Sequence, residues 1–182
     1  MRIAILDRDG VLNEDLPEGV RSPGDLRILP SAADAVARLN RAGVPVILAT
    51  NQSAIGRGTM AAAMLERIHD RLREELALTQ ARLDLILVAP DAPERAGPRR
   101  KPGPGMIEEA LARFRVLPAE APVIGDALSD LQAAAAAGCP RLLVRTGKGA
   151  ATQAAGIPGA VLPVAVYDDL AAAVTALLGG RG

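Results

Sequence analysis

Cysteine, histidine and aromatic residues are almost absent from this sequence. A single cysteine, Cys139, excludes internal disulfides and zinc clusters built from thiolates. His69 is the single histidine. Serine or cysteine nucleophiles activated by histidine, and phosphohistidine phosphatases, are therefore excluded unless His69 itself is the catalytic residue. The charged neighbours of His69 on a helical pattern favour a solvated helix face. With aromatics at 1%, a stacking groove for single-stranded nucleic acid is disfavoured.

The sequence also lacks an excess of charge and a long hydrophobic run. Lys and Arg total 21 and Asp and Glu total 21, so no net charge attracts nucleic acid or an anionic membrane. The first apolar run is too short for a signal peptide, and none approaches a membrane span. We therefore expect a cytoplasmic monomer. Its 182 residues, 49% of them hydrophobic, predict a single domain spanning residues 1–182.

Short apolar runs alternate with longer helical patterns, which is typical of a parallel sheet with crossover helices. Strands are predicted at residues 3–6, 44–49, 83–89, 122–124 and 141–144, with a weaker run at 160–166. Helices are predicted at 32–41, 60–78, 105–114, 128–137 and 168–178, followed by a frayed tail at 179–182. Ser31 is expected to cap the first helix, and Gly43 to end it. The predicted fold is a doubly wound, Rossmann-like α/β sheet with strand order 3-2-1-4-5 and no separate cap domain.

Two acids follow the first predicted strand. Asp7 and Asp9 stand two residues apart, where the apolar run ends and a turn begins at Gly10. In a doubly wound sheet, ligands bind at the carboxyl ends of the strands where the winding direction switches. One carboxylate of such a pair can attack phosphorus while the other protonates the departing oxygen.

Three further polar motifs follow apolar runs or precede predicted helices. They are Thr50-Asn51-Gln52, Arg100-Lys101-Pro102 and the stretch from Gly125 to Asp130. Together with Asp7 to Val11, they resemble the four signatures of the haloacid dehalogenase superfamily of phosphatases, whose first is D-x-D-G-x-T/V. The resemblance covers the chain from Ile3 to about Arg145. It implies the same strand order and a phosphomonoesterase that works through an aspartyl phosphate on Asp7.

The attack of a carboxylate on a phosphate dianion requires a cation nearby. At ~3.5 Å and an effective dielectric constant of about 20, the repulsion is on the order of 9 kcal/mol. Asp7 and Asp126 offer hard oxygen ligands of the kind that suits Mg²⁺. The resemblance implies that the backbone carbonyl of Asp9 is the third protein ligand. Asp130, four residues after Asp126, touches the metal, orients its waters, or only complements a helix dipole.

Two side chains are predicted to act on the phosphoryl group directly. The Thr50 hydroxyl can donate a hydrogen bond to it, and Lys101 can neutralise charge in the transition state. Asp9 must be protonated when the ester oxygen leaves, so we expect a raised pKa for Asp9 while Asp7 stays ionised. An acid at position 9 favours a phosphatase over a phospho-aspartate ATPase, because relatives with a long-lived phosphoenzyme usually carry threonine there.

Within the superfamily, the motifs resemble those of D-glycero-D-manno-heptose 1,7-bisphosphate 7-phosphatases and the related histidinol-phosphatases. The stretch from Thr50 to Gly58 is similar to their T-N-Q-S-G-I-A/G-R-G, and the stretch from Arg100 to Met106 to R-K-P-x-P-G-M. Those enzymes usually carry a zinc loop with C-P-H and C-x-C motifs. Here the aligned positions are 89–91 and 97–99, where every zinc ligand is missing. We expect no structural zinc, and we hypothesise that five prolines between 90 and 104 stiffen this loop instead.

A small phosphorylated sugar is the expected substrate, and no partner beyond it is predicted. Asn51 is assigned to substrate binding with Arg57 and Arg100, which are expected to hold a second phosphate. Arg99 either joins them or is exposed to solvent. Loops alone should wall an open site, with Glu14 and Asp15 as wall residues or solvated acids.

Rival functions are weaker matches to these motifs. A receiver-like signalling domain carries its phospho-accepting acid after the third strand, where this chain has Val88-Ala89-Pro90. A nucleotide-binding domain needs a glycine-rich loop, and Thr146 to Gly149 lacks the spacing. A polynucleotide 3′-phosphatase is disfavoured by the neutral charge and the scarcity of aromatics. A catalytically inactive binding protein is disfavoured because the motif acids and the lysine are intact. Histidinol phosphate is the alternative to a heptose bisphosphate as substrate.

Overall fold

A six-stranded parallel sheet forms the centre of the protein in the computed structural model, which describes residues 1–179. The strand order is β3-β2-β1-β4-β5-β6. The bounds are β1 Ala4–Leu6, β2 Val46–Asn51, β3 Leu85–Ala89, β4 Val123–Gly125, β5 Arg141–Val144 and β6 Ala165–Tyr167. The predicted order of the first five strands is confirmed, and β6 extends the sheet beside β5 at the end of the weak run predicted for 160–166.

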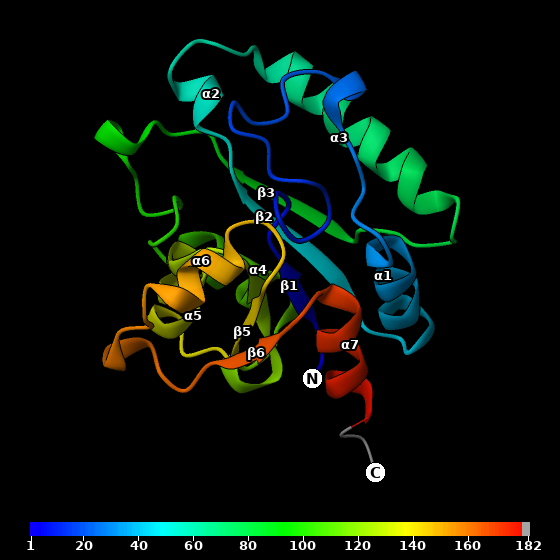
Figure 1. Ribbon diagram of the computed structural model, residues 1–182, viewed down its shortest axis with the longest axis vertical. Helices are drawn as coiled ribbons and strands as arrows, with labels where there is room; N and C mark the ends of the chain where they lie inside the picture. Colours follow the sequence, from blue (N-terminus) through cyan, green and yellow to red (C-terminus); the bar gives the residue numbers. More distant parts are fainter. Residues whose placement is uncertain (180–182) are drawn as a thin grey trace.

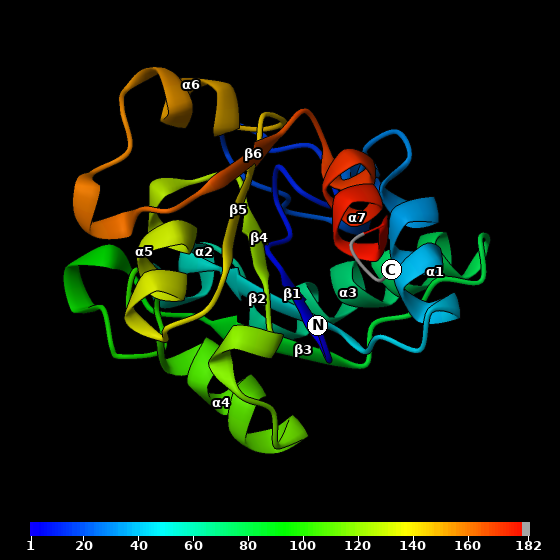
Figure 2. The same ribbon diagram turned by 90° about the horizontal axis from the view of Figure 1, so that it is seen from below.

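Helices cover both faces of this sheet, as the view from below shows (Figure 2). The bounds are α1 Ala32–Arg41, α2 Ser53–Gly56, α3 Ala62–Ala77, α4 Gly105–Phe114, α5 Leu128–Ala136, α6 Gly149–Ala154 and α7 Leu170–Gly179. One face packs against α1, α3 and α7, and the opposite face packs against α4 and α5. Helices α1 and α7 lie side by side although they are far apart in the sequence (Figure 1).

The first strand shows why both faces are covered. Successive side chains of a strand point to opposite faces. Leu6 belongs to the cluster beneath α1, α3 and α7, whereas Ile5 belongs to the cluster beneath α4 and α5. Both side chains are fully buried, and burying each contributes about 1.5–3 kcal/mol. A strand that is apolar on both faces therefore lies in the middle of the sheet, and its end is surrounded by the ends of its neighbours.

The local predictions for helix ends hold only in part. Ser31 does stand at the N-cap of α1, as predicted, but its backbone is left-handed with φ 63° and its side chain makes no capping hydrogen bond. Gly43 does follow the end of α1, with φ +71°. Helices α2 and α6 were missed because four and six residues are too few to show helical periodicity. Gly179, predicted as part of a frayed tail, ends α7, and residues 180–182 of that prediction lie outside the described residues.

No separate cap domain lies over the carboxyl edge of the sheet in the described chain, as predicted. The segment from residue 13 to residue 30 contains only the short 3₁₀ helix Pro23–Asp25. The loop between β3 and α4 contains only the 3₁₀ helix Pro93–Arg95. Between Met1 and Gly179, no helix is both long enough and apolar enough to cross a membrane.

Candidate active site

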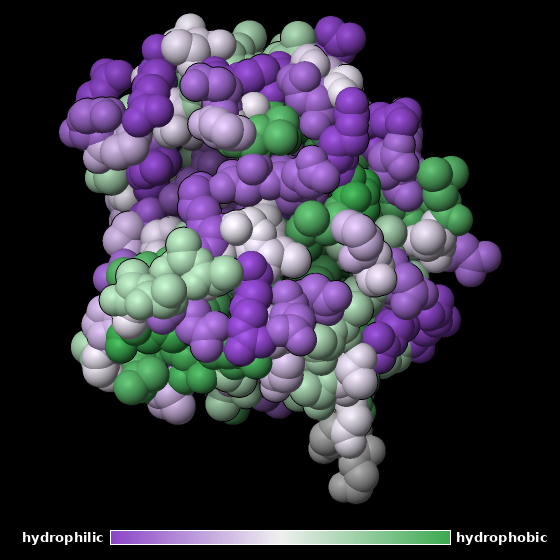
Figure 3. Space-filling model, viewed as in Figure 1, coloured by the Kyte–Doolittle hydropathy of each residue, from purple (hydrophilic) through white to green (hydrophobic). Residues whose placement is uncertain are grey.

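The predicted polar motifs meet in one cavity at the carboxyl ends of the strands. Asp7 follows β1, Thr50 lies in β2, and Asp126 follows β4. The cavity has a volume of about 510 Å³, and its lining includes Asp7, Asp9, Thr50, Asn51, Arg57, Arg100, Lys101 and Asp126. Hydrophilic residues surround a hollow on this face, between α2 and α6 (Figure 3). The four motifs are therefore one site.

Lys101 is the cation nearest to Asp7. Its ammonium nitrogen lies 2.9 Å from Oδ1 of Asp7 and 2.6 Å from Oδ1 of Asp130, and it donates a hydrogen bond of 2.8 Å to the carbonyl of Ala49. Three acceptors match its three protons, which fixes the direction of the side chain. Burial alone would favour a neutral lysine, but Asp130 and Asp7 raise the pKa of Lys101, so it stays charged.

The two carboxylate oxygens of Asp130 bind different partners. Oδ1 pairs with Lys101, and Oδ2 accepts a hydrogen bond of 3.0 Å from the backbone amide of Ala127 at the start of α5. Asp130 is buried and lies with Asp7 and Asp126 in a group of three acids, one oxygen of each lying within 4.8 Å of the others. Because both of its oxygens are engaged, its position suits holding Lys101 better than ligating a metal.

This acid cluster fits a divalent cation. Burial raises the pKa of Asp7 to about 7, with Lys101 opposing the shift and Asp130 and Asp9 adding to it. Burial likewise raises the pKa of Asp126 to about 6, although a hydrogen bond from the Lys148 amide opposes that shift. Carboxylates that repel each other in this way are stabilised as anions by a divalent ion. All the donors are hard oxygens, which matches Mg²⁺ rather than zinc.

The environment of Asp9 differs from the prediction. The Arg8 guanidinium donates to both Asp9 oxygens, at 3.0 and 2.9 Å through Nη2. Asn13 adds a hydrogen bond of 2.9 Å, and Gln52 adds one of 3.1 Å. Burial would raise the pKa of Asp9, but Arg8, Asn13 and Gln52 lower it. The expectation of a raised pKa for Asp9 was wrong because these three donors, to which no role had been assigned, stabilise the ionised carboxylate.

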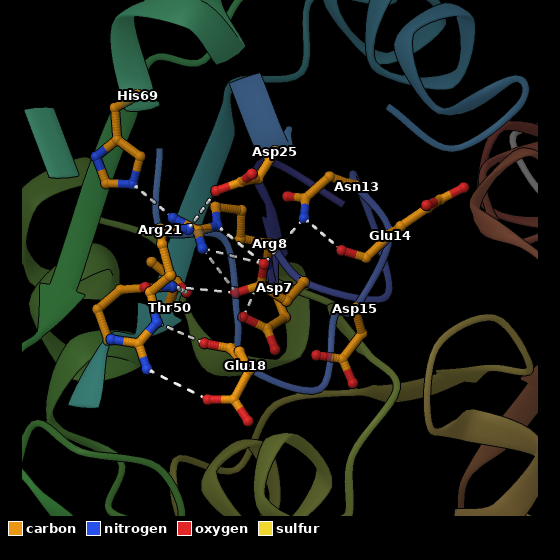
Figure 4. Close-up of polar contacts among 12 residues, drawn as sticks. Asp7, Arg8, Asn13, Glu14, Asp15, Glu18, Arg21, Asp25, Thr50 and His69 are labelled. Atoms are coloured by element: carbon orange, nitrogen blue, oxygen red, sulfur yellow. Dashed lines mark hydrogen bonds and ion pairs between the residues drawn. The ribbon is translucent and has the colours of Figure 1, made fainter. Parts of the chain in front are cut away.

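The prediction for His69 was also wrong, because His69 is buried with 1% exposure. Its Nε2 atom lies 3.5 Å from Nη1 of Arg8, and Figure 4 shows the imidazole reaching from α3 towards the guanidinium. Burial and the charge of Arg8 lower the pKa of His69 to about 4, so the imidazole is neutral and its Nε2 can accept a hydrogen bond. The fully buried Arg8 is thus satisfied by Asp9 on one side and His69 on the other.

The T-N-Q motif orients two groups of the site. Thr50 is buried, and its Oγ1 accepts a hydrogen bond of 2.9 Å from Gln52, so its own hydrogen can be donated into the cavity. The Asn51 side chain donates to the carbonyl of Lys101 at 2.9 Å and accepts from the amide of Lys101 at 3.1 Å. Asn51 was predicted to bind substrate, and in this structure its amide group is engaged with the backbone of Lys101.

The three predicted arginines separate into two groups. Arg57 and Arg100 line the cavity, where burial and then the charge of Arg57 lower the pKa of Arg100. Arg57 is half-exposed and forms a 3.7 Å ion pair with Glu94. Arg99 lies outside the cavity lining, where it pairs with Glu109 and donates to the carbonyl of Val88. Arg99 does not converge with the other two arginines.

The cavity wall contains residues that the motifs did not indicate. Asp15 lines the wall and forms a 2.9 Å ion pair with Lys148, whereas Glu14 is exposed. Lys148 also lines the cavity, and so does Arg21. The stretch containing Lys148 was considered only as a possible nucleotide-binding loop. A signal for Lys148 was its position just beyond the fifth predicted strand, at the same edge of the sheet as the acids.

Comparisons with known proteins show the family to which the chain belongs. A family model described as HAD-hydrolase-like matches residues 98–173. D-glycero-beta-D-manno-heptose-1,7-bisphosphate 7-phosphatase of Bordetella bronchiseptica is 44% identical over 178 residues, which cover 98% of each chain. The enzyme of the same name from Pseudomonas aeruginosa is 40% identical, covering 97% of each chain. The chain belongs to this heptose bisphosphate phosphatase family of haloacid dehalogenase-like hydrolases.

A solved structure of a family member has the same overall fold. The crystal structure of D,D-heptose 1,7-bisphosphate phosphatase from B. bronchiseptica, complexed with magnesium and phosphate, matches with a TM-score of 0.94. It is 43% identical, and the match covers 100% of both chains. This protein is therefore a phosphatase that acts on a phosphate ester, as its motifs predicted by resemblance.

Proposed function

We propose that this phosphatase removes the 7-phosphate of D-glycero-D-manno-heptose 1,7-bisphosphate in a Mg²⁺-dependent reaction through an aspartyl phosphate on Asp7. The observation that carries the proposal is the meeting of Asp7, Asp9, Lys101 and Asp126 in one cavity, which Arg57 and Arg100 also line. The names of relatives that are 44% and 40% identical over nearly the whole chain support the choice of substrate. We also propose that residues 1–182 form a single phosphatase domain, since all six strands belong to one sheet.

Asp7 is the proposed nucleophile. One of its oxygens attacks phosphorus, forming an oxygen–phosphorus bond as the bond to the sugar oxygen breaks. Lys101 holds Oδ1 of Asp7 at 2.9 Å, which leaves Oδ2 for the attack. Thr50 lies at the end of the adjacent strand, where its hydroxyl can donate to a phosphoryl oxygen as charge develops.

Mg²⁺ would be held by the side chains of Asp7 and Asp126 and by the backbone carbonyl of Asp9. It would supply positive charge that offsets the repulsion between the nucleophile and the phosphate. The fit of these oxygen donors and the raised pKa values of Asp7 and Asp126 support this assignment. Asp130 is the proposed positioning residue that aligns Lys101 with Asp7.

Asp9 is the proposed acid and base. Arg8, Asn13 and Gln52 favour its ionised form before substrate binds, which suits the later step in which Asp9 removes a proton from the attacking water. For the first step, Asp9 must carry a proton to the sugar oxygen. The negative charge of a bound phosphate favours protonation of a neighbouring carboxylate, so substrate and proton can enter the site together.

Arg57 and Arg100 are the proposed site for the second phosphate, and Asn51 acts on substrate through Lys101. A guanidinium can hold phosphate with two parallel hydrogen bonds. Arg100 is anchored by a 2.8 Å hydrogen bond from Nη1 to the carbonyl of Asp91, whereas Arg57 forms a 3.7 Å ion pair with the exposed Glu94. An anchored arginine beside a half-exposed one suits a ligand that must enter and leave.

A phosphate-release screen tests the proposal. The substrates are heptose 1,7-bisphosphate, other sugar bisphosphates, sugar monophosphates and histidinol phosphate, each with Mg²⁺ and with EDTA. We expect the heptose bisphosphate to give the highest kcat/KM and EDTA to abolish its turnover. A higher kcat/KM for a monophosphate would contradict the second-phosphate site, and a preference for histidinol phosphate would replace the substrate. Full turnover in EDTA would contradict the requirement for metal.

A further inference from the structure

The segment from Thr146 to Thr152, between β5 and α6, lies against two of the catalytic loops. The hydroxyl of Thr146 donates a 2.6 Å hydrogen bond to the carbonyl of Gly10, directly after the Asp7 and Asp9 pair. The hydroxyl of Thr152 donates a 2.9 Å hydrogen bond to the carbonyl of Asp126. Two threonines of one segment thus hold the backbones of two separate motifs.

The same segment holds the carboxylate of Asp126. The backbone amide of Lys148 donates a 2.8 Å hydrogen bond to Oδ2 of Asp126. Gly147 has φ +55°, and a Cβ atom at this position would overlap Oδ2 of Asp126 and the Cα atom of Gly10. The absence of a side chain at Gly147 is therefore what lets the segment lie so close to the acid. With Oδ2 held from this side, Oδ1 is the oxygen left for a metal.

The side chain of Lys148 extends the contact to the wall of the cavity. Its ammonium pairs at 2.9 Å with Oδ2 of Asp15, which is only 17% exposed, while the lysine side chain is 66% exposed. Both residues line the cavity. Lys148 therefore contacts Asp126 through its backbone amide and the wall residue Asp15 through its ammonium group.

We propose that the segment from Thr146 to Thr152 is a positioning element of the active site, in which Thr152 holds the backbone of Asp126, the Lys148 amide holds its carboxylate, and the Lys148 ammonium fixes the wall at Asp15. The proposal rests on the proposed function, in which Asp126 holds Mg²⁺. It makes two separable predictions, because the hydrogen bonds to Asp126 act on the metal and the ion pair with Asp15 acts on the substrate.

The first test measures Mg²⁺ binding by calorimetry on substrate-free protein, using MgCl₂ as the titrant. Thr152→Val removes the hydroxyl and keeps the shape, and Thr152→Ser restores the hydroxyl. We expect Thr152→Val to raise the Kd for Mg²⁺ roughly five- to tenfold, as the loss of one hydrogen bond predicts, and Thr152→Ser to return it close to the wild-type value. Thr146→Val, which frees the carbonyl of Gly10, is the second variant if Thr152→Val does not fold.

Asp126→Asn distinguishes failure of this inference from failure of the proposed function. Equal Mg²⁺ affinity in Asp126→Asn and wild type would refute the metal assignment itself. Weaker binding in Asp126→Asn, with wild-type binding in Thr152→Val, would overturn the positioning role alone. A loss in Thr152→Ser as large as in Thr152→Val would also overturn it, because the hydroxyl would then not be the cause.

The second test concerns the ion pair at the wall. We expect Lys148→Met to raise KM about tenfold while kcat and the Kd for Mg²⁺ change less than about twofold, because the backbone amide of residue 148 is retained. Lys148→Arg should keep most of the affinity. In an Asp15→Asn background, Lys148→Met should have little further effect. Additive effects of the two changes, or a fall in kcat without a change in KM, would overturn this part of the proposal.

Discussion

The buried, neutral imidazole of His69 should make the free energy of unfolding fall as the pH is lowered. Its pKa is lowered from 6.5 to about 4 by burial and by Arg8, so between these values the unfolded chain binds a proton that the folded chain does not. The contribution of His69 is complete above the unfolded pKa and is lost as the pH falls towards the folded one. At about 1.36 kcal/mol per pKa unit, the full loss is about 3 kcal/mol. By the same relation, about 2 kcal/mol of it is already lost at about pH 5.

Two buried carboxylates titrate in the opposite sense. Burial raises the pKa of Asp7 to about 7 and that of Asp126 to about 6, so the folded chain binds protons there that the unfolded chain releases. Their contribution grows as the pH falls and disappears as the pH rises through these values. The pH profile of the wild type alone therefore mixes both effects. The difference between wild type and His69→Gln isolates the histidine.

The assay is urea unfolding of wild type and His69→Gln, in EDTA, at several values between about pH 5 and pH 8. Glutamine has no titrating group and keeps an oxygen that can accept from Arg8. We expect the free energy of unfolding of the wild type, relative to that of the variant, to fall by about 2 kcal/mol between about pH 7.5 and pH 5. Parallel pH profiles for the two proteins would refute the burial of a neutral imidazole against Arg8.

Three changes in the cavity give further predictions, each checked by steady-state kinetics. Asn51→Leu should lower kcat roughly tenfold with little change in KM, because Lys101 loses both backbone hydrogen bonds to Asn51; an unchanged kcat would contradict this role. Thr50→Val should lower kcat about a hundredfold if its hydroxyl donates in the transition state, and a change in KM alone would contradict that. Arg100→Met should raise KM about tenfold for a bisphosphate but not for a monophosphate. Arg99→Met is the matched control, since Arg99 pairs with Glu109 away from the cavity, and equal effects of the two changes would argue against a second-phosphate site.

The strands and the location of the site could be predicted from local patterns, and the strand order followed from the doubly wound layout and the resemblance of the motifs. The apolar runs place five strands, and each motif follows a run or precedes a helix, so the motifs must gather at one edge of the sheet. The weak sixth strand was harder to predict, because only Ala165–Tyr167 pair with β5 and none of these three residues is fully buried.

Contacts between distant segments could not be predicted in the same way. The contact of Arg8 with His69 joins residues 61 positions apart and depends on how α3 packs on the sheet. A signal was nevertheless present: His69 lies four residues after Leu65 and three before Leu72, and all three are buried on one face of α3. The prediction followed the charged neighbours of His69 instead and placed His69 on a solvated helix face. The pKa of Asp9 was mispredicted for a related reason, because Arg8, which lowers that pKa, is buried beside His69 of the same helix.

Transfer of the phosphoryl group to Asp7 can be measured directly by trapping it. Asp9→Asn removes the base that would activate water, and p-nitrophenyl phosphate has a leaving group that departs without a proton, so the phosphoenzyme should accumulate. Acid quenching followed by reduction with borohydride and peptide mass spectrometry then locates the modified residue. We predict one phosphoryl group per chain, found at Asp7 and absent when Asp7→Asn is added. A burst of p-nitrophenol with Asp7 unmodified, or turnover that persists in Asp7→Asn, would contradict the aspartyl phosphate mechanism.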